Sequence, residues 1–385
     1  MSMVKKGKLN IEIEYLRFFA IVAVLLEHLP TLYIWSKHQL LQNINKYVEF
    51  WPGVDLFFAI SGYLIATNLL THRDSKQSPS QIFRHTIIPF FVKRIYRLLP
   101  ASWFWMFVVL FFSAFYNVTN AFGEFRHNVI YCITIITFSF NIFSGYLLEQ
   151  GYLPTYGPYW SLSLEEQFYF VAPFILLFMR TGWKVTTLSL LAVFLLYIVQ
   201  QGDWSPNFRY HGLIFGVLLA MLKLSLGSKI KPRILERWYL RYLVNIFLLF
   251  SLFAIPAALK GSVYLFGSLA MISTLLVYIA SWDSGFFMSP GSEGIVSRSM
   301  SWIASRSYSI YLAHMPVIYF VQESTVRIMV HYGFAAGDSY MRSLWMTIAA
   351  LGLIFVSSEL SYRYLEVPLR NKGRNVARKY EVTAG

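Results

Sequence analysis

The sequence is poor in cysteine and in charged residues, and each shortage excludes a class of protein. Cys132 is the only cysteine among 385 residues, so an intrachain disulfide and a CxxC-type metal or redox motif are excluded, and we expect no metal site. Charged residues make up only 14% of the chain, with 19 Asp and Glu against 33 Lys and Arg. No polar stretch is long enough for a separate soluble domain.

Apolar and aromatic residues dominate instead. Hydrophobic residues make up 56% of the chain, which includes 34 Phe, 26 Tyr and 11 Trp, far more apolar surface than a soluble core needs. Apolar stretches able to cross roughly 30 Å of hydrocarbon recur from end to end. We therefore predict an all-α, polytopic membrane protein in which residues 1–385 form a single membrane domain.

The number of apolar segments is odd, so they cannot all cross the membrane if the basic loops are to lie on one side. Eleven segments lie near residues 11–31, 52–71, 97–116, 128–148, 161–180, 185–200, 209–222, 242–258, 262–281, 302–322 and 343–362. If all of them crossed, basic loops would lie on opposite sides of the membrane. The weakest is 128–148, whose "TIITFSFNIFSGY" is rich in Thr, Ser and Asn. We interpret it as a re-entrant or partial helix, which leaves about ten transmembrane helices.

The basic residues indicate the orientation. The net charge of +14 is concentrated in the loops at 72–97 and 223–241 and in the C-terminal tail, as expected for cytoplasmic loops contacting membrane lipids rather than for nucleic-acid binding. Residues 1–10 and 371–385 are then cytoplasmic tails, and 117–127 and 147–159 are extracytoplasmic. No small-residue cleavage site follows the first apolar run, so it is a retained span rather than a signal peptide.

The first span, "EYLRFFAIVAVLLEHLP", contains Arg17 and His28. Eleven residues make three helical turns plus about 20°, so both side chains project from one face, roughly 16 Å apart along the axis. In this orientation Arg17 lies in the cytoplasmic half and His28 near the outer end. A structural ion pair or a snorkelling end group is the alternative, but ionisable groups inside a span usually line a functional cavity.

Two further segments place polar groups at membrane depth. In "WPGVDLFFAISGYLI", Asp55 is shallow, whereas Ser61 and Gly62 lie mid-membrane, where small residues permit close helix packing or a ligand against the backbone. In "YGPYWSLSLEEQFYFVAPF", Glu165 and Glu166 enter a span at about the depth of His28. Adjacent glutamates diverge by about 100° on a helix, so we expect only one of them to pair with His28.

Other candidates are basic. "RSYSIYLAHMPV" places His314 near the middle of its span, and "FRYHGLIFG" adds Arg209 and His211 on the outer side. "VKRIYRLLP" places Arg94 and Arg97 three residues apart on one helix face at the cytoplasmic end of the third span. Such a pair can bind phosphate or pyrophosphate, although an ordinary positive-inside anchor is an equally simple explanation.

Six motifs in order resemble the membrane-bound acyltransferase family 3. They are the Arg17 to His28 spacing, "GVDLFFAISGYLI", "RIYRLLP", "WSLSLEEQFY", "SYSIYLAHMP" and "YLEVPLR". The resemblance implies ten transmembrane helices in a bacterial plasma (inner) membrane. It also implies acyl-CoA, used from the cytoplasm as a co-substrate rather than a bound cofactor, and an envelope glycan or lipid-linked sugar, such as lipopolysaccharide or peptidoglycan, acylated outside. Because the chain ends in a basic tail, we expect the stand-alone form without a fused SGNH-type domain.

The resemblance suggests roles for the polar residues. Arg94 and Arg97 would bind the donor, with Ser61 and Gly62 beside it, and Arg17 would belong with the catalytic residues as part of the polar path from the donor to His28. His28, oriented by Glu165 or Glu166, would be either the base that accepts the proton of the acceptor hydroxyl or a nucleophile that holds the acyl group as an acyl-imidazole. The sequence does not separate these two routes. Asp55, His314, Arg209 and His211 are further candidates.

Two other functions also place charged groups inside a helical bundle. A transporter or glycan flippase would do so, but such proteins often show repeated halves with one midplane site, and the sequence shows no clear repeat. A non-catalytic partner of a polysaccharide synthase would tolerate replacement of His28.

Overall fold

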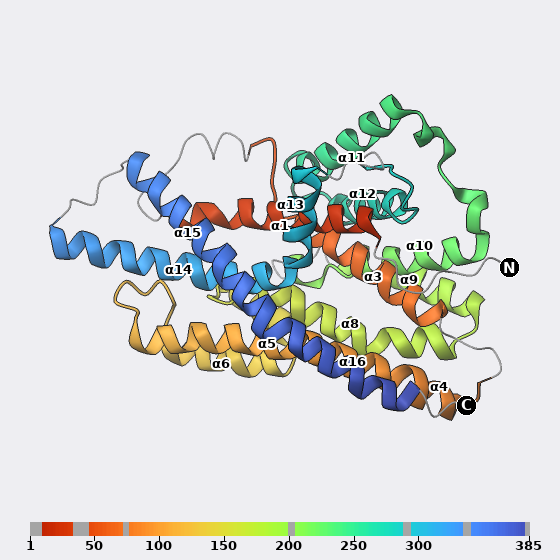
Figure 1. Cartoon of the computed structure of the whole chain (residues 1–385), viewed down its shortest axis with the longest axis horizontal. Coiled ribbons are helices and arrows are strands. Elements are labelled where there is room, and N and C mark those ends of the chain that lie inside the picture. Colours follow the sequence, from red (N-terminus) through yellow and green to blue (C-terminus); the bar gives the residue numbers. More distant parts are fainter. Residues whose placement is uncertain are drawn as a thin grey trace.

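The computed structural model describes residues 10–33, 46–71, 77–198, 205–287, 294–333 and 340–381. Within these ranges the chain is helical and contains no β-strand, which confirms the all-α prediction (Figure 1). Most of the predicted cytoplasmic tail at 1–10, and residues 382–385, lie outside the described residues.

Ten helices in the described part of the chain have 16 or more residues, and five α-helices are shorter. The long helices are α1 (Ile11–His28), α3 (Gly53–Thr71), α5 (Ile88–Phe115), α8 (Tyr159–Phe178), α9 (Thr181–Ile198), α10 (His211–Leu226), α11 (Trp238–Ala258), α12 (Leu265–Ala280), α14 (Ser307–Tyr332) and α15 (Tyr340–Ser361). The shorter helices are α4 (Pro79–Ile82), α6 (Phe125–Ile136), α7 (Phe140–Glu149), α13 (Ile295–Ser305) and α16 (Val367–Glu381).

Seven helical stretches of the described chain are long and apolar enough to cross a membrane. They are Ile11–Leu32, Gly53–Thr71, Pro79–Phe115, Tyr159–Phe178, His211–Ile230, Trp238–Ala258 and Ser343–Glu381. Apolar stretches in α9 and α12 are shorter, and α14 is long but holds polar residues such as Gln322 and Glu323 in its second half. The chain is therefore an all-α, multi-pass membrane protein, as predicted from its composition.

The segment predicted as a re-entrant or partial helix consists of α6 and α7. These helices have 12 and 10 residues, about 18 and 15 Å, so neither alone spans the hydrocarbon. The chain breaks at Phe138, which has a positive φ of 56° and whose carbonyl accepts a hydrogen bond from Gln167 of α8. At the other end, Gly123 before α6 lies against Thr155 after α7. The chain thus turns back at Phe138 between two short helices, as expected for a segment that does not cross as one helix.

Two helices extend beyond the segments that hydropathy marks. α4 continues through a π-helical turn at Phe83–Ile87 into α5, so the third helix begins well before residue 97. α15 likewise continues through a π-helical turn at Tyr362–Glu366 into α16, so the predicted tail at 371–385 is helical as far as Glu381. α16 lies along α5 (Figure 1). Both extensions are polar because, as shown below, they line a cavity.

α3 and α10 pack unusually closely because each presents glycine to the other. A Cβ atom on Gly62 would lie 2.0 Å from the carbonyl oxygen of Leu213, and one on Gly216 would lie 2.3 Å from that of Ala59. Neither distance is tolerable, and the obstacle is backbone in both cases. Gly62 therefore serves helix packing, the first of the two roles that its small size permits.

The topology prediction can be tested in the chain that follows α7. Leu153 and Thr155 both lie in this predicted extracytoplasmic stretch. Leu153 is the better site for a cysteine label, because it is 87% exposed whereas Thr155 is half-buried against Gly123. We expect Leu153→Cys, in a background with Cys132→Ser, to react with a membrane-impermeant maleimide in intact cells. Reaction only after the cytoplasm has been opened would contradict ten crossings with both termini inside.

Candidate active site

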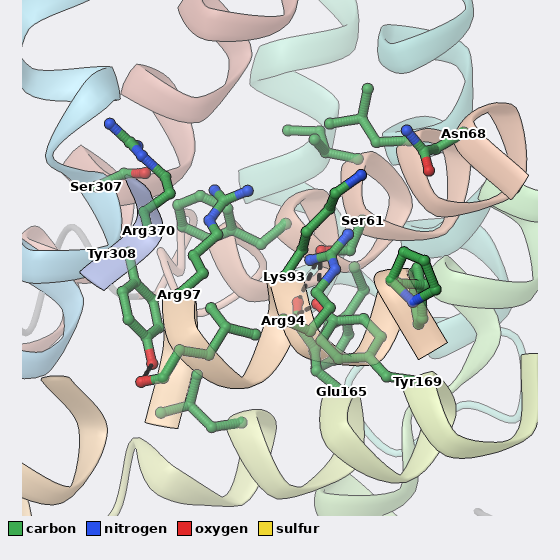
Figure 2. A pocket seen from close by; sticks show the side chains of 18 of the residues that line it. Ser61, Asn68, Lys93, Arg94, Arg97, Glu165, Tyr169, Ser307, Tyr308 and Arg370 are labelled. Atoms are coloured by element: carbon green, nitrogen blue, oxygen red, sulfur yellow. Dashed lines mark hydrogen bonds between the residues drawn. The ribbon is translucent and has the colours of Figure 1, made fainter. Parts of the chain in front are cut away.

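A cavity of about 750 Å³ lies between α1, α3, α5, α8, α14 and α16. Six of its lining side chains are Arg or Lys, against two carboxylates. The basic residues are Arg17, Lys93, Arg94, Arg97, Arg370 and Arg374. The acidic residues are Glu165 and Glu381. Figure 2 shows Arg94 and Lys93 near Ser61 and Glu165, with Arg370 on the side of Ser307 and Tyr308. Such an excess of positive charge in a hollow of this size suits an anionic ligand.

Arg94 and Arg97 both line this cavity, as their spacing on one helix face predicts. The guanidinium of Arg94 lies 4.6 Å from the ring centroid of Tyr169, and Nε of Arg97 is buried without a hydrogen-bond partner. Neither arginine forms an ion pair within the described part of the chain. By contrast, Arg17 is held by Glu14 at 2.6 Å. The charges of Arg94 and Arg97 therefore remain available to a ligand.

Only one of the two adjacent glutamates, Glu165, lines the large cavity, as expected for neighbouring positions on a helix. Glu165 lines the large cavity, where it accepts hydrogen bonds from Ser61 Oγ at 3.0 Å and from Tyr169 Oη at 2.6 Å (Figure 2). Glu166 does not line that cavity and borders only a void of about 20 Å³ beside Tyr308, which Glu165 also borders. Ser61 is thus in the cavity, whereas its neighbour Gly62 lies against α10 and does not line it.

His28 lies outside the cavity and contacts His314, with the two ring centroids 4.9 Å apart. Each ring places Nδ1 on a backbone carbonyl of its own helix: His28 on Val24 at 2.9 Å, and His314 on Tyr311 at 2.6 Å. Because a carbonyl oxygen only accepts, both Nδ1 atoms must donate, and Nε2 is the ring nitrogen with the free lone pair. His314 is fully buried and its Nε2 has no partner in the described structure.

His28 thus packs against His314 and not against Glu165, one of the two glutamates predicted as its partner. The hydrogen bonds of Glu165 go to Ser61 and Tyr169, and His28 packs against His314 instead. The reason is the arrangement of helices: α1 packs on α3, α13 and α14, whereas α8 packs on α3 and α7. Equal depth in the membrane does not make two helices neighbours.

Tyr311 connects the cavity with the two histidines. Its side chain lines the cavity, its hydroxyl bonds Ser161 Oγ at 2.6 Å, and its ring centroid lies 5.7 Å from that of His314. The sequence prediction did not include Tyr311, Ser161 or Tyr169. A periodicity argument would have found them, because Ser161 and Tyr169 flank Glu165 at four-residue spacing and Tyr311 precedes His314 by three residues.

Asp55 and Arg209 form a buried ion pair away from the cavity. Arg209 donates to Asp55 at 2.8 Å, with both side chains about 95% buried or more. Its guanidinium also lies over the rings of Trp51 and Trp160 at 4.5 and 4.7 Å. Neither these two candidates nor His211 lines the cavity. The Asp55–Arg209 pair joins α3 to the start of α10, whereas His211 is buried and neither of its ring nitrogens has a hydrogen-bond partner among the described residues.

The chain matches the family model described as "Acyltransferase domain" over residues 10–362. It is 27% identical to the "Peptidoglycan O-acetyltransferase OatA" of Listeria monocytogenes over 94% of this chain and 56% of that protein. It is 25% identical to the "O-acetyltransferase OatA" of Staphylococcus aureus over 93% of this chain and 57% of that protein. The chain thus spans little more than half the length of these relatives. No solved structure matches it. The family match covers α1 to α15, which include every helix that lines the cavity except α16, and the chain belongs to acyltransferase family 3.

Proposed function

We propose that the protein is an acyl-CoA-dependent O-acyltransferase. It takes an acyl group, most simply acetyl, from acyl-CoA in the cytoplasm and attaches it to a hydroxyl of a cell-envelope glycan on the outer side. The protein lies in the bacterial plasma membrane with both termini inside. The relatives are named for O-acetyl transfer, one of them to peptidoglycan, and this favours a cell-wall glycan as acceptor.

The observation that supports an acyl-CoA donor is the uncompensated positive charge in the cavity. CoA carries a pyrophosphate and a 3′-phosphate, and Arg94 and Arg97 offer planar donor groups that form no ion pair with a carboxylate in the described part of the chain, although Glu165 lies in the same cavity. Beyond them the cavity reaches Ser161 and Tyr311, so an extended thioester arm can point toward the histidines. A transporter for a neutral sugar would have no use for six cations there.

The tautomer of His28 suits the chemistry. Its Nδ1–H is held by Val24, so Nε2 can accept the proton of the acceptor hydroxyl while the oxygen attacks the thioester carbonyl carbon. The C–S bond then breaks, and the CoA thiolate takes up the proton. In the alternative route, Nε2 itself attacks the carbonyl carbon, the C–S bond breaks and the CoA thiolate leaves; the acceptor hydroxyl then attacks the acyl-imidazole, the bond between the acyl carbon and Nε2 breaks, and the hydroxyl proton passes to the thiolate. The same free nitrogen serves both routes.

The function is tested by mass spectrometry of envelope glycans from cells with and without the protein. The appearance of an added acyl mass only in cells with the protein supports the enzyme. An identical acylation pattern in both would contradict it. Feeding labelled acetate to the same cells identifies the acyl group.

The donor site makes a prediction for the two cavity arginines. Replacing Arg94 or Arg97 with Ala is expected to weaken CoA binding about tenfold or more, because each change removes a charge-assisted hydrogen bond donor to phosphate. Isothermal titration of purified variants with CoA measures the loss. Arg233→Ala, at an exposed site away from the cavity, is the matched control. Unchanged affinity for both Arg94 and Arg97 variants would make these residues ordinary positive-inside anchors.

A further inference from the structure

Two of the six basic residues in the cavity come from α16. Arg370 and Arg374 lie four residues apart, so they project from the same side of that helix, and both line the cavity. The family match ends at residue 362, before α16 begins at Val367. α16 therefore adds a wall to the cavity beyond the residues that the family model matches, and Arg374 also lies beyond the "YLEVPLR" motif that ends at Arg370.

The position of α16 relative to α5 is well defined. Tyr96 packs on Gly373, where a Cβ atom would lie only 2.5 Å from that of Tyr96. Farther along, Lys93 Nζ lies 2.5 Å from Glu381. Higher residue numbers on α16 thus meet lower numbers on α5, so the helices run antiparallel. Arg370 lies near the level of Arg97, and Arg374 lies one turn closer to Lys93.

The charges on α16 are only weakly compensated. Arg370 is 3.6 Å from Glu366, and its Nε is buried without a partner. Arg374 is exposed and forms no ion pair with any described residue. Two facing helices therefore present two levels of cations, one at Arg97 and Arg370 and one at Lys93 and Arg374. A ligand with separated phosphate groups can contact both levels at once.

We infer that α16 is part of the donor site and that Arg374, with Lys93, binds the 3′-phosphate of CoA. This inference rests on the proposed acyl-CoA donor. The thioester end must point toward Tyr311 and the histidines, so the nucleotide occupies the other end, where Lys93, Arg374 and Glu381 lie. The 3′-phosphate on the ribose is farther from the thioester than the pyrophosphate is. The pyrophosphate then lies between Arg370 on α16 and Arg94 and Arg97 on α5.

The test compares CoA with 3′-dephospho-CoA by titration of the full-length protein. Wild type is expected to bind CoA about tenfold more tightly than dephospho-CoA, in line with one arginine–phosphate interaction. Arg374→Ala is expected to bind both ligands with the weaker affinity. Arg370→Ala should weaken both ligands about equally, and Arg370→Lys should recover part of the loss. Glu381→Gln should tighten CoA binding, because it removes a competing carboxylate from Lys93.

Lys372→Ala is the matched control, since it removes the same charge from the same helix at an exposed position that does not line the cavity. Thermal unfolding of each variant verifies that α16 has remained in place. If wild type discriminates between the two ligands and Arg374→Ala discriminates equally well, the inference is overturned while the acyl-CoA donor stands. If wild type binds neither ligand, the proposed donor itself is wrong, and the inference falls with it.

Discussion

Replacement of His28 by Gln is expected to lower acyl transfer to glycan about 10²-fold or more, the usual contribution of a general base. Glutamine has no basic nitrogen to take the proton of the acceptor hydroxyl. Expression, thermal stability and CoA binding should stay close to wild type, because His28 is half-buried and lies outside the cavity. The measurement is transfer of label from acyl-CoA to glycan in vesicles, with CoA titration in parallel.

His28→Asn is a closer control for the structural role of the ring. The amide nitrogen of Asn can take the position of Nδ1 and keep the hydrogen bond to Val24, while the Nε2 position is lost. Equal loss of transfer in both variants therefore assigns the effect to Nε2. If either variant retained near-normal acylation, His28 would be structural and the base would have to be sought at His314, whose Nε2 is also free.

The two chemical routes differ in what accumulates without an acceptor. Rapid quenching after mixing with labelled acyl-CoA should trap label on His28 if an acyl-imidazole forms, whereas direct transfer leaves the protein unlabelled. His28→Asn provides the blank for this experiment. The result decides between a base and a nucleophile at the same nitrogen atom.

Features that depend on helical period and hydropathy were predictable from the sequence. The first span, expected at 11–31, matches the helical stretch Ile11–Leu32, and the weakest segment proved to be the helical pair α6 and α7. Arg94 and Arg97 line one cavity because three-residue spacing fixes their common face whatever the rest of the chain does. The divergence of Glu165 and Glu166 follows from the same geometry.

Features that depend on which helices are neighbours were not predictable. His28 and Glu165 have similar expected depth, yet α1 meets α14, so the partner of His28 is His314. The packing of α16 along α5 was also missed. Its sequence "RNKGRNVARKY" is too polar for a span, and this helix packs against the bundle through the contacts of Gly373 with Tyr96 and of Glu381 with Lys93. Hydropathy ranks segments by their preference for lipid and does not detect a polar helix that lines a cavity.

The second large effect concerns stability rather than chemistry. Asp55→Ala is expected to lower the free energy of unfolding by about 3–5 kcal/mol, the usual cost of removing one partner of a buried ion pair. The guanidinium of Arg209 stays about 95% buried but loses the carboxylate at 2.8 Å. Contacts with Trp51 and Trp160 offset only part of that loss, since a ring face is a weaker partner than a carboxylate.

Thermal unfolding in detergent measures this change, and Arg363→Ala is the comparison. Arg363 pairs with Glu359 but is 66% exposed, so its removal should cost less than about 1 kcal/mol because solvent screens the pair. Asp55 does not line the cavity, so the molecules of Asp55→Ala that fold should bind CoA and transfer acyl groups at near the wild-type rate. The opposite pattern, a stable protein without transfer activity, would return Asp55 and Arg209 to the catalytic site, because an ion pair that only joins α3 to α10 has no means of slowing the reaction once the fold is intact.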